Sequence, residues 1–245
     1  MDSGYYAAMS GLVARTQALD TAASNLANAQ TPGYRAEREY FRSVLLGPQA
    51  LDSQLGRTVN NFGVLGGDAL NLRQGPLQQT GNPLDLALEG EGFFQIQTSN
   101  GARFTRDGNF HRSPAGMLVT DKNEPVLSSA GQPIPIPPGE VSVGANGVIS
   151  VAGGAVATVG VFAFAPGVQL VPEGANRYVA PASVKPAAMT NTAVHQGALE
   201  SANEDVVQGS LDLLMMQRQA EMMQKALTVF HTEFNKIATE DLPKV

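Results

Sequence analysis

The chain has 245 residues, and its 16 lysines and arginines against 22 aspartates and glutamates give a formal net charge of −6. This mild acidity excludes the basic face that nucleic-acid binding requires, and it offers no charge attraction to an anionic membrane surface. The absence of cysteine excludes disulfides, thiolate catalysis and thiolate metal sites.

The first predicted element is a long N-terminal helix. Thr31-Pro32-Gly33 would end it, because proline lacks the N–H donor and glycine permits a left-handed exit, and Asp2 or Ser3 would cap its start. We therefore assign residues 1–34 to the N-terminal helix of a coiled-coil domain. Within this segment, side chains at alternating spacings of three and four residues form the stripe expected of a helix that packs on another helix: Met9, Leu12, Thr16, Leu19, Ala23 and Leu26.

Residues 35–80 have no sustained period, and we predict that they form a connector. Residues 37–46 are consistent with either a continued helix or the start of a strand. The glycine pair Gly66-Gly67 marks a possible hairpin in an otherwise irregular segment rich in Gly, Asn and Gln.

The central segment, residues 81–190, changes to a period of two residues, which predicts strands. The leucines of residues 84–89 (LDLALE) stand at every second position. Large apolar and glutamine side chains alternate in the same way over residues 94–97 (FQIQ). Turn signals then divide the segment into short strands, which predicts an antiparallel meander that closes into a small sandwich or barrel. These signals are Asn100-Gly101, Asp107-Gly108, Ala115-Gly116 and Asn146-Gly147, with further strands at 155–165 and 177–180.

The last segment, residues 191–245, contains a second predicted coiled-coil helix. Ser201 and Glu204 have the spacing of a capping box, and Pro243 lies just beyond the expected end. Additional apolar residues beside the main stripe widen the apolar face, which is typical of a helix that contacts more than one partner. The main stripe is Val206, Gly209, Leu213, Met216, Ala220, Met223, Leu227, Phe230, Phe234 and Ile237.

The fold class predicted from these elements is α+β, with the N- and C-terminal helices forming a coiled-coil layer and a central antiparallel β-rich domain. An isolated helix with an apolar stripe is marginal in water. We therefore expect the two ends to become ordered on assembly with other chains. Asn25 and Asn28 would either cap the first helix or form hydrogen bonds that fix the register of the helices between subunits.

Four groups of residues resemble the signatures of bacterial flagellar rod and hook proteins. They are residues 24–34 (SNLANAQTPGY), 80–94 (TGNPLDLALEGEGFF), 104–110 (FTRDGNF) and 196–201 (QGALES), with Gln217-Arg218 and Glu221 further on. The opening residues 1–11 are most similar to the proximal rod members. The sequence departs from the family pattern at Ala220, where an aromatic residue commonly precedes the acidic one.

The resemblance implies a structural subunit of the proximal basal-body rod, without enzymatic activity, that polymerises into the torque-transmitting shaft. Its implied partners are copies of itself, homologous rod subunits and the flagellar export apparatus. The implied location is the part of the basal body that spans the periplasm, reached without a cleaved signal peptide. The residues that we expect at the assembly interface are Met9, Leu12, Leu19, Asn25, Leu26, Asn28, Val206, Leu213, Met216, Ala220, Met223, Leu227, Phe230 and Phe234.

The alternatives are a distal rod or short hook-like subunit or, from another class, a secreted carbohydrate-binding or enzymatic β domain.

No apolar run approaches the roughly 20 residues that span a bilayer, so we expect no direct membrane insertion. His111, His195 and His231 lack neighbouring metal ligands, and no nucleophile motif is present. We accordingly predict no catalytic residues, no metal and no cofactor. Glu89 and Glu91 are more readily explained as solvated charges beside a glycine turn than as paired catalytic carboxylates.

Overall fold

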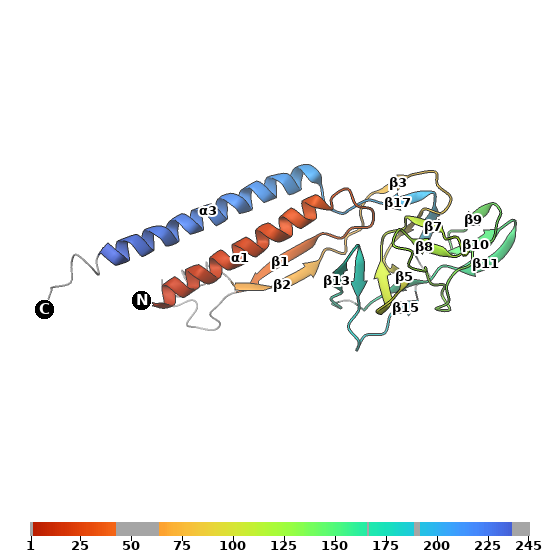
Figure 1. The fold of residues 1–245 in the computed structure, drawn as a ribbon, viewed down its shortest axis with the longest axis horizontal. Helices are drawn as coiled ribbons and strands as arrows, with labels where there is room; N and C mark the ends of the chain where they lie inside the picture. Colours follow the sequence, from red (N-terminus) through yellow and green to blue (C-terminus); the bar gives the residue numbers. More distant parts are fainter. Residues whose placement is uncertain (1, 43–63, 166, 189–191, 237–245) are drawn as a thin grey trace. The chain divides into compact units, whose positions relative to one another are not determined.

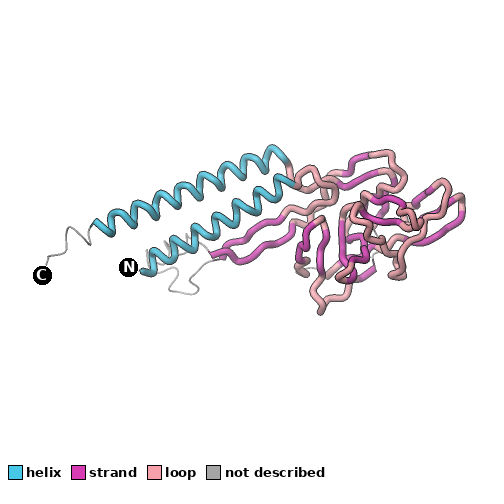
Figure 2. Tube along the Cα trace, viewed as in Figure 1, coloured by secondary structure: helices cyan, strands magenta, loops and turns pink. Residues whose placement is uncertain are grey.

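A computed structural model describes residues 2–42, 64–165, 167–188 and 192–236 (Figures 1 and 2). The chain divides into two compact units. The first, called here the helical unit, comprises residues 1–27, 37–69 and 205–245. The second, called the β unit, comprises residues 28–36 and 70–204.

The helical unit contains the two predicted helices, α1 (Asp2–Ala27) and α3 (Val206–Lys236). They run side by side in opposite directions (Figure 1), and Arg15 Nη1 of α1 donates a hydrogen bond of 2.8 Å to Gln219 Oε1 of α3. The strands β1 (Glu37–Arg42) and β2 (Val64–Leu70) pair with each other, and β1 contacts α1. Both helices and the α+β class are therefore confirmed, whereas a coiled-coil layer between chains stays a prediction.

The start of α3 differs from the prediction, because Asp205 caps the helix and the box at Ser201–Glu204 does not. Asp205 Oδ1 accepts hydrogen bonds of 2.9 Å from the backbone N–H groups of Val207 and Gln208. A short carboxylate directly before the first turn satisfies N–H donors that have no partner inside the helix.

Two segments between the helices contain more regular structure than their sequence suggested. Residues 37–42 form β1, so the strand alternative was the right one for this part of residues 37–46. Gly66 and Gly67 lie inside β2, so the suggested hairpin at this pair was wrong. Residues 43–63, also part of the predicted connector, lie outside the described residues.

The β unit pairs its strands antiparallel, and its largest sheet has the order β13-β14-β6-β5-β12-β15. This order is not that of a simple meander, because β14 and β12 return from later in the chain to flank the β5–β6 hairpin. The strands of the whole β unit are β3 (Leu77–Gln79), β4 (Leu86–Glu89), β5 (Phe93–Thr98), β6 (Gly101–Thr105), β7 (Phe110–Arg112), β8 (Leu118–Thr120), β9 (Val141–Val143), β10 (Val148–Val151), β11 (Gly154–Thr158), β12 (Val161–Ala163), β13 (Val171–Gly174), β14 (Arg177–Val179), β15 (Ala187–Ala188), β16 (Ala193–Gln196) and β17 (Ala198–Glu200).

Three of the four predicted turns join paired strands, and the fourth does not. Asn100-Gly101 lies at the β5–β6 hairpin, Ala115-Gly116 at β7–β8 and Asn146-Gly147 at β9–β10. Asp107-Gly108 instead follows β6 at the point where the chain leaves that sheet for the β7–β8 hairpin. Gly108 serves close packing, since a Cβ there would lie 1.6 Å from the carbonyl oxygen of Leu86.

The β unit has two apolar clusters that its alternating strands build. The larger includes Phe94 and Phe110, whose ring centroids are 5.2 Å apart in an edge-to-face arrangement, and Ile134, which lies between Pro133 and Pro135. The smaller is centred on Phe93 and Tyr178, whose ring centroids are 5.7 Å apart. These clusters bury most of the large apolar side chains of the unit and give it a core of its own.

Candidate functional site

The contact between α1 and α3 is built mainly from small residues. Gly11, Ala14 and Ala18 are the buried positions along the middle of α1, and Gly209 and Ala220 are buried on α3. Small side chains let two helices approach closely. The inward face of α1 therefore follows the expected spacing of three and four residues on a different set of positions from the predicted stripe.

On α1, the predicted stripe borders this buried face. Met9 is 43% exposed, Thr16 and Ala23 are also exposed, and Leu12, Leu19 and Leu26 are half-buried. On α3 the stripe coincides better with the buried face, since Leu227 is buried and Leu213, Met216 and Met223 are half-buried. Val206 is exposed, and the side chains of Phe230 and Phe234 lie outside the described structure.

A second apolar surface runs along α3, and we call it the outer face. At 3.6 residues per turn its members lie on the side of the helix opposite Gly209, Ala220 and Leu227. They are large, and Met222, for example, is 61% exposed. The outer face consists of Val207, Leu211, Leu214, Met215, Met222 and Val229.

Asn25 and Asn28 make contacts within the chain. Asn25 Nδ2 donates a hydrogen bond of 2.8 Å to the backbone carbonyl oxygen of Glu37, and Asn25 Oδ1 accepts one of 2.9 Å from the backbone N–H of Glu37. Thr31 Oγ1 donates to Asn28 Oδ1 at 3.4 Å. Asn25 thus links the end of α1 to the start of β1, and a role in register between subunits stays a prediction for both residues.

The β unit contains a buried ionic cluster, formed by Arg35, Arg106 and Glu200, that sequence reasoning missed. Arg35 Nη2 lies 2.8 Å from Glu200 Oε1, and Arg106 Nη1 lies 2.9 Å from Glu200 Oε2. The three side chains are only 1%, 3% and 1% exposed. The backbone N–H of Gly75 also donates to Glu200 Oε1, at 2.8 Å. Each residue stands in one of the family-like motifs or directly after it, but those motifs gave no indication that the three meet.

The cluster and its backbone contacts join Arg106 to three other segments of the β unit. The backbone carbonyl oxygen of Glu200 accepts a hydrogen bond of 2.7 Å from the backbone N–H of Gly33. Arg35 Nη1 donates a hydrogen bond to the backbone carbonyl oxygen of Arg73. Asn203 extends the network, because its Nδ2 donates to the carbonyl oxygen of Asn71 at 2.6 Å and its Oδ1 accepts from the N–H of Ala36 at 2.8 Å. Residues 33–36, 71–75 and 200–203 are thereby fixed to one another close to the points where the chain leaves this unit.

Burial shifts two pKa values in this part of the β unit. Burial lowers the pKa of Arg106 to about 10 against the opposing attraction of Glu200, and the nearby charge of Arg35 lowers it further. Burial also raises the pKa of Asp107 to about 6, with further contributions from the carboxylates of Asp121 and Asp85.

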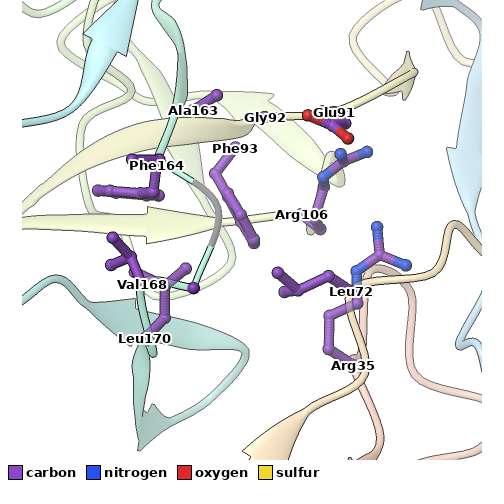
Figure 3. A pocket seen from close by; sticks show the side chains of 12 residues that line it. Arg35, Leu72, Glu91, Gly92, Phe93, Arg106, Ala163, Phe164, Val168 and Leu170 are labelled. Atoms are coloured by element: carbon purple, nitrogen blue, oxygen red, sulfur yellow. The ribbon is translucent and has the colours of Figure 1, made fainter.

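A cavity of about 180 Å³ lies beside the cluster. Figure 3 shows Arg35 and Arg106 on one side of it and Phe164, Val168 and Leu170 on the other. The ring of Phe93 lies between them, 5.4 Å from the guanidinium carbon of Arg106.

The histidines and acidic residues considered in the sequence analysis form few contacts with one another. His195 Nε2 lies 2.6 Å from Glu89 Oε2, and both side chains are exposed, which fits a surface contact. Within the described residues, no group of three or more His, Cys, Asp or Glu side chains is arranged to hold a metal ion. The described helices include none that is both long and apolar enough to cross a bilayer.

Two family models match this chain. One, described as "Flagella basal body rod protein", matches residues 6–35, and the other, described as "Flagellar hook protein FlgE/F/G D1 domain", matches residues 87–151. The first match covers most of α1 and ends at Arg35, and the second begins in β4 and ends with β10.

Curated relatives align over nearly the whole chain. The flagellar basal-body rod protein FlgF of Caulobacter vibrioides is 34% identical over 100% of both chains. FlgF of Salmonella typhimurium is 33% identical over 93% of this chain and 94% of the relative. The flagellar basal-body rod protein FlgG of Bacillus subtilis is 29% identical over 91% of this chain and 93% of the relative.

Proposed function

The chain belongs to the family of flagellar basal-body rod proteins, and we propose that it is a structural subunit of the proximal rod that assembles through its helical unit. Five FlgF proteins are among its relatives, at 32–34% identity, which supports the proximal position. The expected work of such a subunit is to transmit torque for motility through buried surface, and no bond is made or broken in it.

The outer face of α3 is the observation that carries this proposal. Contact with α1 occupies the face around Gly209, Ala220 and Leu227, yet the opposite side presents large apolar side chains such as Leu214 and Met222. Full burial of one such side chain contributes about 1.5–3 kcal/mol. We infer that this face packs against helices of neighbouring copies or homologous rod subunits, with Leu12, Leu19 and Leu26 of α1 completing the contact.

The β unit has its own core and ionic cluster, so it can keep its shape while the helices engage neighbours. Its proposed role is to space and hold the outer part of adjacent subunits. We also propose that the chain reaches the rod through the flagellar export apparatus, without a cleaved signal peptide, and that it has no catalytic activity.

The proposal is tested by making the outer face polar without touching the contact with α1. We expect the double variant Leu214→Ser, Met222→Ser to purify with unchanged helix content and to abolish swimming, because the apolar area lost lies on the surface of the free subunit. The matched control is Gln217→Ser, Gln224→Ser, which changes two exposed polar residues of the same helix and should swim normally. Normal swimming by the serine double variant would contradict an assembly role for the outer face.

A complementation experiment distinguishes the proposed proximal position from the alternative position in the distal rod. We expect the gene for this chain to restore swimming to a strain that lacks the proximal rod protein FlgF and to fail in a strain that lacks FlgG. The opposite result would assign the chain to the distal rod, in keeping with its FlgG relatives at 29% and 30% identity.

A further inference from the structure

The cavity beside the ionic cluster combines an apolar wall with a cationic one. Phe93, Phe164 and Leu170 supply the apolar side, and Arg35 and Arg106 supply the charges. Pockets for drug-sized ligands measure about 300–1,000 Å³. A cavity of about 180 Å³ therefore accommodates one compact molecule or one side chain.

The charges around this cavity are unequal. Two buried guanidinium groups share the one buried carboxylate of Glu200, which leaves one positive charge in excess among the three. Within the described structure, the one carboxylate that lines the cavity is that of Glu91, which attracts Arg106 but is exposed, so water screens its charge. Removing an unbalanced charge from water is costly unless a counter-charge approaches it.

The hydrogen-bond inventory supports the same conclusion. The buried Nε atoms of Arg35 and of Arg106 have no acceptor within the described part of the chain. Buried donors without partners are rare in folded proteins, and those of a guanidinium are suited to carboxylate oxygens. Two buried N–H donors beside the cavity are thus left without a partner within the described residues.

We propose that this cavity binds a compact carboxylate with an apolar body, whose carboxylate faces Arg35 and Arg106 and whose body lies against Phe93 and Phe164. The aromatic rings provide the apolar contact, and the guanidinium groups provide the charge-assisted hydrogen bonds. The carboxylate is supplied either by a free small acid or by an acidic side chain of another subunit.

The test uses the full-length protein and phenylacetate as the probe, with its neutral isostere phenylacetamide for comparison. We expect saturable shifts of the backbone amide resonances of Gly92, Phe93 and Gly167 with phenylacetate, and affinity at least tenfold lower for phenylacetamide. Equal affinity for both compounds, or no shift with phenylacetate at millimolar concentration, would overturn the proposal.

A blocking variant keeps the result tied to this cavity. Ala165 is an exposed residue of the lining, so Ala165→Phe should fill the space without disturbing the cluster and reduce phenylacetate affinity at least tenfold. Ala130→Phe, at an exposed position outside the lining, is the matched control and should bind like the unchanged protein. Equal affinity of the two variants would place the probe elsewhere and refute the site.

The source of the carboxylate is decided by association measurements on the same proteins. If an acidic side chain of another subunit occupies the cavity, both phenylacetate and Ala165→Phe will weaken association with a homologous rod subunit. If a free acid occupies it, association will be unchanged while phenylacetate still binds. Both outcomes support the carboxylate site, and both are independent of whether the outer face of α3 drives assembly.

Discussion

In the β unit, large side chains are among the most deeply buried, whereas in the helical unit the most deeply buried side chains are mostly small. Phe94 and Phe110 are 0% and 1% exposed, while Met9 and Met222 are 43% and 61% exposed beside a buried Ala14. A core of large side chains stabilises a unit on its own. A contact of small residues brings two helices together but leaves their large apolar side chains available to another molecule.

The two units also differ in how deeply they bury charged side chains. The β unit encloses two arginines and a glutamate, and each of the three makes further contacts with backbone groups. Of the charged side chains described along α3, those of Arg218, Glu221 and Lys225 are exposed and that of Asp212 is half-buried. We infer that the β unit is stabilised mainly by interactions inside the chain, and the helical unit in part by interactions with its neighbours.

The largest expected effect comes from Glu200→Gln, which removes the one negative charge between two buried arginines. Loss of a partner from a buried ion pair typically costs about 3–5 kcal/mol, because the remaining charge is left uncompensated. We expect the free energy of unfolding of the β unit, from urea denaturation, to fall by this amount. The helix signal of α1 and α3 should be affected much less.

The matched control is Glu173→Gln, which removes the exposed partner of Arg103. Exposed ion pairs contribute little, because water screens them. We expect no change in the urea midpoint for this variant. A Glu200→Gln protein as stable as the control would show that the ionic cluster does not stabilise the β unit.

A smaller effect is expected for Ala14→Leu in the contact between α1 and α3. Leucine has nearly the helix propensity of alanine, so the change tests packing alone. Adding bulk to a close contact costs about 1–3 kcal/mol. We expect the thermal midpoint of the far-ultraviolet circular dichroism signal at 222 nm to fall in the free protein.

Ala23→Leu is the control for this change, because Ala23 is exposed on the same helix. It should leave the midpoint unchanged. If Ala14→Leu had no effect either, the two helices would not be packed on each other in the free subunit, and the contrast between the units would become sharper still. That result would support the prediction that both ends become ordered only on assembly.

The sequence was sufficient to predict the two helices, the part of the α3 stripe between Gly209 and Leu227, and three of the four turns, because each depends on local spacing or on turn-forming residues. It failed on the inward face of α1, since the large residues Met9 and Leu12 suggested a stripe that in fact borders the buried glycine and alanines. Burial at Ala14 depends on the approach of α3, which no local pattern in α1 records.

The ionic cluster was beyond sequence reasoning for a related reason. Arg35, Arg106 and Glu200 are separated by 71 and 94 positions in the chain, and only the folded β unit brings them together. Asp107-Gly108 was mistaken for a hairpin because its composition fits a turn. The glycine is instead required by the nearby backbone of Leu86, a contact that the sequence does not encode locally.

The smallest predicted effect concerns Asp107, a residue of the β unit whose carboxyl pKa is raised to about 6. Its ordinary pKa is 3.8, so in the folded protein the protonated form is favoured relative to the unfolded chain. The unfolded chain then binds fewer protons between these values, and the free energy of unfolding falls as pH rises from about 4 through about 6. Ionised Asp107 is therefore a destabilising group at neutral pH.

We expect Asp107→Asn to stabilise the β unit at pH 7.5 by about 1–2 kcal/mol, a figure reduced from about 1.4 kcal/mol per pKa unit because the side chain is partly solvated. At pH 4 the gain should vanish. Asparagine keeps an oxygen that can accept the backbone N–H of Asn109, which lies 3.0 Å from Asp107 Oδ1. Glu140→Gln, at an exposed position, should show no such pH dependence. An equal effect of Asp107→Asn at both pH values would mean that burial does not oppose this charge. The tolerance of the β unit for buried charge would then extend beyond its paired groups.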